Sequence, residues 1–170
     1  MKKFELTSEF VTFLGKKLFR IKALVSFGDV KEGELGGLVE KEENLDQSGN
    51  AWVSGNAWVS GDARVYGDAR VYGNAWVSGD ARVYGDAWVS GDARVQNCRD
   101  YSATSCFGSE NRTTTFFRTK DGGISVRCGC FYGTLAEFRE KVKERHGGRR
   151  LAKEYLMLAD LMEFRLSKDE

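Results

Sequence analysis

The chain has 170 residues and an almost balanced charge, with 26 Lys and Arg against 25 Asp and Glu. This balance gives no bulk electrostatic reason to expect an anionic membrane surface or nucleic acid as a partner. No apolar run approaches the roughly 20 residues that span a bilayer, and Met1-Lys2-Lys3 is not followed by the apolar core of a signal peptide. We therefore expect a cytoplasmic protein without a membrane partner, whose four cysteines stay reduced.

Residues 1–46 have the pattern of a mixed β segment. Two runs rich in aliphatic and aromatic residues, 10–14 and 17–24, lie on either side of Gly15-Lys16 and predict a hairpin that turns there. The repeats that follow would leave strand edges open at their first coil, and natural proteins cover such edges. We therefore predict an N-terminal β cap over residues 1–46.

Residues 49–96 are eight consecutive six-residue units of the form Gly-(Asn/Asp)-Ala-(Trp/Arg)-Val-(Ser/Tyr/Gln). Alternation along a strand points Ala and Val to one side and the residues around Val to the other. Ala and Val are small enough to fill a narrow tube, and the Gly-Asn and Gly-Asp pairs supply its corners. The pattern predicts a β-solenoid over residues 47–98, with Trp, Arg, Tyr and Ser outside.

This repeat resembles the hexapeptide-repeat, or left-handed parallel β-helix, family, in which three units make one coil of about 18 residues. The resemblance implies three flat faces on which each strand pairs with the strand 18 residues later. The first face then carries Trp52, Arg70 and Trp88, with Tyr72 beside them. The second carries Trp58, Trp76 and Arg94. The third carries Arg64, Tyr66, Arg82 and Tyr84.

The chain after the repeats predicts a small second unit. Residues 99–113 are polar and are expected to form a connecting loop, and residues 114–170 a ββαα domain. Lys120-Asp-Gly-Gly123 is a hairpin turn, and Thr134 with Glu137 is a capping box that opens a helix. The second helix, from Arg150 to about Phe164, should bury one face, made of Leu151, Tyr155, Leu158, Leu161 and Met162. Such a unit is too small to be very stable alone, so we expect it to dock on the solenoid or on another subunit.

The flanking segments resemble other proteins. Ile21-Lys22-Ala23-Leu24 and Phe27-Gly28-Asp29-Val30 are similar to the lead-in of bacterial and prophage proteins grouped as acyltransferases. The tail from Cys128-Gly129-Cys130 to His146-Gly147 resembles a short domain that recurs in bacteriophage proteins. These resemblances imply a phage or prophage protein that acts in the host bacterial cell.

Acyltransferases of the family, as the resemblance implies, use a His of a coil or its loop as general base beside an acyl-CoA groove between subunits. Here the repeats contain no His, and His146 near a predicted helix end has an ordinary explanation in the helix dipole. We therefore predict a protein without catalytic residues or cofactor. The cysteines lack the C-x2-C spacing of a zinc site, and the Asn/Asp columns cap turns, so no metal site is predicted.

The outward Trp, Tyr and Arg side chains have two interpretations. Arg stacked on Trp could form a cation–π ladder that only stabilises the sheet surface. However, these residue types also dominate the centres of protein interfaces. Because members of the family are mostly trimers, we predict a homotrimer whose interface contains Trp52, Trp58, Trp76, Trp88 and Arg94. The predicted ligand- or partner-binding residues are Arg64, Tyr66, Arg82, Tyr84, Arg70 and Tyr72.

Three functions follow from this sequence, in decreasing order of support. The first is a phage accessory protein that binds a host protein or a nucleotide-type small molecule. It would inhibit a bacterial defence system, either as an anti-CRISPR or by sequestering a second messenger. The second is a structural or virion scaffold protein, and the third is an acyltransferase that uses acyl-CoA. The sequence leaves nucleic acid open as a partner.

Overall fold

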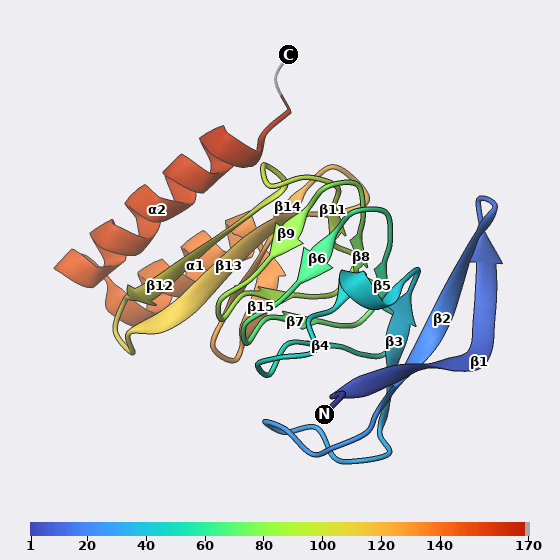
Figure 1. The fold of residues 1–170 in the computed structure, drawn as a ribbon. Coiled ribbons are helices and arrows are strands. Elements are labelled where there is room, and N and C mark those ends of the chain that lie inside the picture. Colours follow the sequence, from blue (N-terminus) through green and yellow to red (C-terminus); the bar gives the residue numbers. More distant parts are fainter. Residues whose placement is uncertain (169–170) are drawn as a thin grey trace.

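The computed structural model describes residues 1–168, which form a mainly β protein with a solenoid between two terminal units (Figure 1). The N-terminal unit contains β1 (Phe4–Phe13), β2 (Lys16–Ala23), β3 (Leu35–Val39) and the short 3-10 helix η1 (Glu42–Asn44). The C-terminal unit contains β12 (Tyr101–Phe107), β13 (Arg112–Arg118), β14 (Ile124–Cys128), β15 (Phe131–Thr134), α1 (Leu135–His146) and α2 (Arg150–Leu166).

The solenoid consists of two-residue strands that begin every six residues. They are β4 (Trp52–Val53), β5 (Trp58–Val59), β6 (Arg64–Val65), β7 (Arg70–Val71), β8 (Trp76–Val77), β9 (Arg82–Val83), β10 (Trp88–Val89) and β11 (Arg94–Val95). Each pairs in parallel with the strand 18 residues away, which gives the sheets β4-β7-β10, β5-β8-β11 and β6-β9. The prediction of a β-solenoid with three different faces is confirmed, and the solenoid has about three turns.

The interior of the solenoid holds only the small side chains of the repeat. Every Ala and Val from Ala51 to Val95 is at most 1% exposed. The coils are joined by backbone hydrogen bonds such as Trp52 N–H to Ala69 O (3.0 Å). Glycine is required at the corners: Gly79 has φ +62°, and a Cβ there would lie 2.3 Å from the Gln96 carbonyl oxygen. The repeat therefore encodes both the tube and its corners.

The N-terminal unit extends one face of the solenoid. Strands β1 and β2 form the predicted hairpin, and β3 pairs in parallel with β5, so one sheet runs β1-β2-β3-β5-β8-β11. The coil before β6 is completed by Leu45, which bridges to Val65. Buried Asn44 donates to the carbonyl oxygens of Gly61 (3.1 Å) and Ala63 (2.8 Å). These contacts cover the first strand edges of two of the three faces, those that begin with β5 and β6, as the cap prediction required.

The C-terminal unit differs from the predicted ββαα domain, because its antiparallel sheet has four strands in the order β12-β13-β14-β15. The prediction of a loop over residues 99–113 is wrong for Tyr101–Phe107, which forms β12. Tyr101 pairs with Phe117 of β13, and its hydroxyl donates to the Arg82 carbonyl oxygen (2.6 Å). The polar sequence concealed this strand, since its stabilising contacts are made with distant segments.

The four-stranded sheet lies between the helices and the end of the solenoid (Figure 1). Phe117 and Tyr101 join the solenoid core, whereas Phe116 joins the core under α1 and α2. The predicted docking on the solenoid and the predicted helix pair are therefore confirmed. On α2, Leu158 is buried as predicted, but Leu161 is 57% exposed, so its assignment to the core is wrong.

The buried amide of Asn44 gives a first prediction. Asn44→Ala removes the partner of two buried carbonyl groups and of the Lys41 N–H, which donates to Asn44 Oδ1 (2.9 Å). The free energy of unfolding should fall by about 2–3 kcal/mol. Urea unfolding followed by circular dichroism would measure it. The control is Asn50→Ala, whose exposed amide bonds only Asp68 and should cost less than about 0.5 kcal/mol. Equal losses in the two variants would contradict the prediction.

Lys3 gives a second prediction, on pH. Its side chain is 4% exposed and donates to the Ala51 carbonyl oxygen (2.9 Å). Burial lowers the pKa of Lys3 from 10.5 to about 8. Between about pH 8 and 10.5 the unfolded chain therefore binds more protons at this residue than the folded chain, and folded stability contributed by Lys3 rises with pH.

The measurement is the free energy of unfolding of the wild type minus that of Lys3→Met, at pH 7 and at pH 10. This difference should be larger at pH 10, because all other titrating groups are common to both proteins. A difference that stays constant or shrinks would show that the ammonium is not disfavoured by its surroundings.

Candidate functional site

The candidate site is the Arg/Tyr face, which we define as Arg64, Tyr66, Arg82 and Tyr84. Strands β6 and β9 are parallel and place Arg64 directly beside Arg82. The alternating Val65 and Val83 point into the tube, so the residues on either side of each Val point outward. The Tyr66 and Tyr84 rings are nearly parallel, at 12°, with centres 5.3 Å apart. The structure thus brings these four predicted residues together.

The two guanidinium groups of this face are exposed, and no acidic residue within residues 1–168 pairs with them. Among residues 1–168, none of the ion pairs or side-chain hydrogen bonds involves the guanidinium of Arg64 or Arg82. Like charges placed opposite one another on neighbouring strands repel. A bound anion would remove this repulsion, so the pair is suited to phosphate or carboxylate groups.

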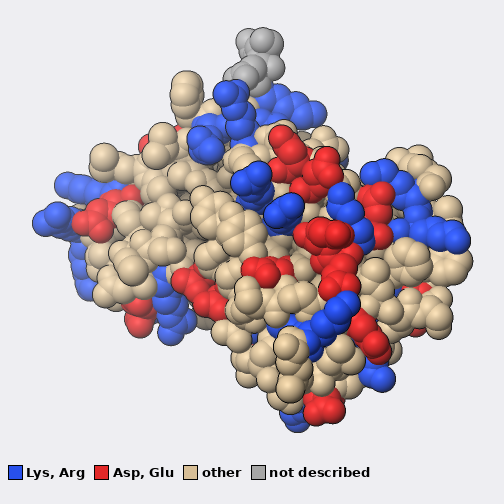
Figure 2. Space-filling model, in the orientation of Figure 1, with Lys and Arg blue, Asp and Glu red and all other residues tan. Residues whose placement is uncertain are grey.

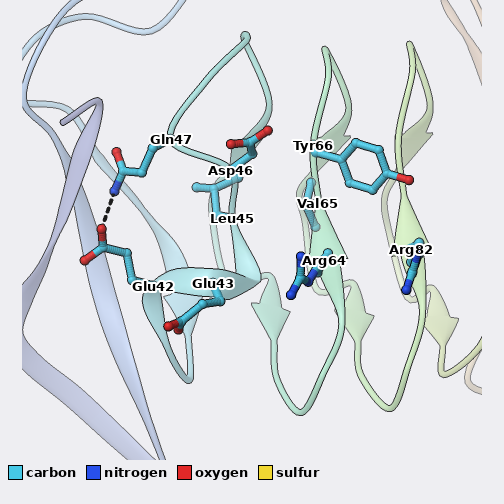
Figure 3. A pocket seen from close by; sticks show the side chains of 9 residues that line it. All are labelled: Glu42, Glu43, Leu45, Asp46, Gln47, Arg64, Val65, Tyr66 and Arg82. Carbon is cyan, nitrogen blue, oxygen red and sulfur yellow. Dashed lines mark hydrogen bonds between the residues drawn. The ribbon is translucent and has the colours of Figure 1, made fainter. Parts of the chain in front are cut away.

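A recess of about 670 Å³ lies beside the two arginines, at the N-terminal end of this face. It is lined by Glu42, Glu43, Leu45, Asp46, Gln47, Arg64, Val65, Tyr66 and Arg82. Figure 3 shows Arg64 and Arg82 on adjacent coils on one side, and the acidic residues of the N-terminal unit on the other. The ring of Tyr66 points from its own coil toward the next coil, which carries Arg82 (Figure 3). The recess therefore has a positive and a negative wall.

Two carboxylates of the negative wall, Glu42 and Asp46, are stabilised in their ionised form. The Lys2 ammonium donates to Glu42 (2.9 Å) and lowers the pKa of that carboxyl, and Gln47 donates to Glu42 as well. The backbone N–H of Ser48 donates to Asp46 and lowers its pKa in the same way. Carboxylates with lowered pKa values accept protons poorly near neutral pH. The recess is therefore better suited to binding a ligand with separated charges than to proton transfer.

The second face is a ladder that the chain partly covers itself. The indole rings of Trp58 and Trp76 are parallel at 4°, with centres 4.7 Å apart, and the Arg94 guanidinium lies 4.0 Å from the Trp76 ring centre. The expected cation–π stacking is thus present here. Phe13, near the tip of the β1–β2 hairpin, packs edge-on against both indoles, at 4.7 and 5.1 Å. This ladder therefore stabilises contacts within the chain.

The first face is divided between the two terminal units. The expectation that Trp52 lies outside is wrong, because it is 2% exposed beneath Phe4 and Phe27, whose rings pack edge-on against it. Arg70 forms an ion pair with Asp29 of the N-terminal unit.

At the other end of this face, the guanidinium of Arg127 lies over Trp88 and Tyr72, 5.2 and 6.0 Å from their ring centres. Trp88 is 41% exposed. The predicted binding residues Arg70 and Tyr72 thus contact the terminal units and lie on a different sheet from the Arg/Tyr face.

The remaining candidate residues, except Cys98, are in the C-terminal unit. His146 is buried at the end of α1, with its ring stacked on Tyr155 at 5.6 Å. The four cysteines are free thiols. Within residues 1–168 no three His, Cys, Asp or Glu side chains converge as metal ligands. Over the same residues no helix is long and apolar enough to cross a membrane.

Sequence reasoning missed the acidic wall of the recess, formed by Glu42, Glu43 and Asp46. These residues lie outside the regular repeats and reach the site because Leu45 pairs with Val65. An aliphatic residue 20 positions before Val65 was the available signal, but the spacing departs from the 18-residue coil.

Comparison with known families agrees with this architecture. Residues 63–79 and 75–91 match the model of the YdcK β-solenoid repeat. No curated protein matches the chain. The matched segments cover β6 to β10, the regular part of the solenoid that carries the Arg/Tyr face. The six-residue repeat, the strand pairing and this match together show that the chain is a β-solenoid repeat protein.

Proposed function

We propose that this chain is a non-enzymatic binding protein that takes up a nucleotide-type ligand at the Arg/Tyr face. The observation that carries the proposal is the adjacent pair of guanidinium groups of Arg64 and Arg82, which form no ion pair within residues 1–168, beside a recess of about 670 Å³. This volume is within the usual range of small-molecule sites, about 300–1,000 Å³.

The chemistry of the recess fits the parts of a nucleotide. Two guanidinium groups in register can bind one phosphate through several charge-assisted hydrogen bonds. The Tyr66 and Tyr84 rings offer an aromatic surface on which a base can stack. Glu43 and Asp46 on the opposite wall can accept hydrogen bonds from amino or hydroxyl groups.

The arrangement of the chain supports this choice of face. The other two faces carry contacts from the terminal units, through Phe13 on one and through Asp29 and Arg127 on the other. On the Arg/Tyr face the two arginines have no ion-pair partner in the described part of the chain, and Tyr84 is exposed. A protein that keeps two repelling cations side by side loses stability there, and ligand binding is a direct reason to keep them.

Three further features belong to the same proposal. The solenoid is a left-handed β-helix of hexapeptide type; the six-residue period and the three faces support this part of the proposal. The protein is of phage or prophage origin and acts in the host cytoplasm, where sequestration of a nucleotide signal would inhibit a defence system. It assembles as a homotrimer through the surfaces of Trp58, Trp76, Trp88 and Arg94 that the terminal units leave accessible, and the buried Trp52 is now left out of this interface.

Native mass spectrometry of protein purified gently from bacterial cells tests the proposal first. A trimer with extra small-molecule mass is expected, and that mass identifies a nucleotide. A monomer would overturn the trimer, and extra mass equal to that of coenzyme A would overturn the assignment of the ligand. A protein without extra mass, which also fails to bind nucleoside monophosphates and cyclic dinucleotides in calorimetry, would overturn ligand binding.

Charge reversal at the site provides the matching mutational prediction. Arg64→Glu with Arg82→Glu should weaken nucleotide affinity by about a hundredfold or more, since it removes both phosphate contacts and adds two repelling charges. Isothermal titration calorimetry would measure the change. The control variant Lys31→Glu with Arg99→Glu makes the same change of net charge at exposed residues elsewhere and should retain wild-type affinity. Equal losses in both double variants would indicate a general effect of charge rather than a site.

A further inference from the structure

The C-terminal unit contains a second, separate cavity. It measures about 90 Å³ and lies between α1, the β14–β15 turn and the segment 109–112. Its apolar lining comes from Phe131, Phe138, Val142 and Tyr155. A cavity of about 150 Å³ can hold benzene, so this smaller one has room for a single small aliphatic group. It is far too small for a whole nucleotide or cofactor.

One of the residues that line this cavity is a histidine. His146 lines it and is 9% exposed, yet among residues 1–168 no hydrogen bond or ion pair uses its imidazole. Its ring nitrogens are not among the fully buried, unpartnered side-chain atoms of residues 1–168, so water or a ligand can reach them. An accessible imidazole nitrogen in the lining of a cavity can form a hydrogen bond with a ligand that enters it.

The rim of the cavity is basic. Arg112, Lys141 and Arg145 all line it, and all three are exposed. Lys141 is paired with Glu144, and Arg145 has only a distant contact with Glu110, at 4.0 Å. No ion pair within residues 1–168 involves Arg112. At least two guanidinium groups at the mouth are therefore available to an acidic partner.

The surrounding surface has the same sign. Residues 140–154 contain six Lys and Arg against three Glu. Figure 2 shows blue side chains gathered at the end of the molecule where α1 ends and α2 begins, with fewer red ones among them. This basic surface therefore favours a partner with negative charge.

We propose that this cavity is the anchor pocket for an acidic peptide segment of a partner protein, which inserts one small aliphatic side chain such as Leu or Val. The aliphatic group fills the space between Phe138 and Val142, and neighbouring Asp or Glu residues of the peptide bind Arg112 and Arg145. A backbone carbonyl of the peptide accepts a hydrogen bond from His146. This surface is distinct from the Arg/Tyr face and does not depend on a nucleotide bound there.

The size of the cavity favours a peptide over the alternatives. A nucleic acid would contact the cations without using an apolar pocket lined by Phe138 and Val142, and a lipid chain is too long for about 90 Å³. An anchor side chain in a small apolar pocket, surrounded by charged contacts at its rim, is a common arrangement in peptide recognition.

The test uses the full chain and a displayed library of random dodecapeptides. Enriched peptides should share one Leu, Val or Ile with Asp or Glu on either side. A fluorescein-labelled synthetic copy would then be titrated in fluorescence anisotropy. Replacing its aliphatic residue by Gly should weaken binding by at least about tenfold. Enrichment of basic or charge-free peptides, or of none, would overturn the proposal.

Two exposed residues of α1 provide a matched pair of variants. Arg145→Glu changes a cation of the rim and should weaken peptide binding by at least about tenfold. Lys143→Glu makes the same charge change two residues away, outside the cavity lining, and should weaken it less than about threefold. Equal losses would assign the binding to the general basic surface and overturn the anchor pocket.

A cavity-filling variant completes the test. Val142→Trp should abolish peptide binding, and circular dichroism would check that this variant folds. If Val142→Trp does not fold, the exposed variant Arg145→Glu still tests the proposal. If fluorescein-labelled oligothymidylate binds with the same dependence on Arg145 and displaces the peptide, the surface is a nucleic-acid site and the proposal is wrong.

Discussion

The structure depends on one interaction, the parallel ladder of backbone hydrogen bonds between residues one coil apart. Bonds such as Trp52 N–H to Ala69 O and Tyr66 N–H to Val83 O hold the coils in register. Because the register is fixed, every side chain lies directly beside the equivalent residue of the next coil. The repeat therefore stacks Trp58 on Trp76, Tyr66 beside Tyr84 and Arg64 beside Arg82. Favourable and repulsive pairs follow from the same constraint.

The ends of such a ladder decide which of these surfaces remain free. At the first coil, the N-terminal unit supplies β3 and Leu45 as pairing partners and places Phe13 against the tryptophans. At the last coil, the four-stranded sheet inserts Phe117 and Tyr101 into the end of the tube. Covering the ends thus also occupies parts of two faces and leaves the Arg/Tyr face beside a recess. The proposed ligand site results from capping as much as from the repeat.

The two proposed surfaces differ in how the chain builds them. The Arg/Tyr face is made by neighbouring coils, and Arg64 lies beside Arg82 because strands β6 and β9 are paired. The cavity near His146 is made by a helix packed on a sheet, with Phe138 and Tyr155 forming its floor and a basic helix end forming its rim. One surface borders an open recess with charged walls, and the other is a small apolar pocket with a charged mouth. They therefore suit different ligands, and a single chain can present both.

The sequence by itself determined the solenoid, its interior and the grouping of side chains on three faces. The reason is that each six-residue unit forms one side of a coil, so the repeat period fixes where every side chain lies. It also predicted the β1–β2 hairpin, the β13–β14 hairpin and both helices, which rest on local turn and capping signals. Only the tertiary structure decided that Trp52 is buried, that Tyr101–Phe107 is a strand and that Glu42, Glu43 and Asp46 border the site. Those outcomes depend on contacts between segments far apart in the chain, which a local sequence pattern does not predict.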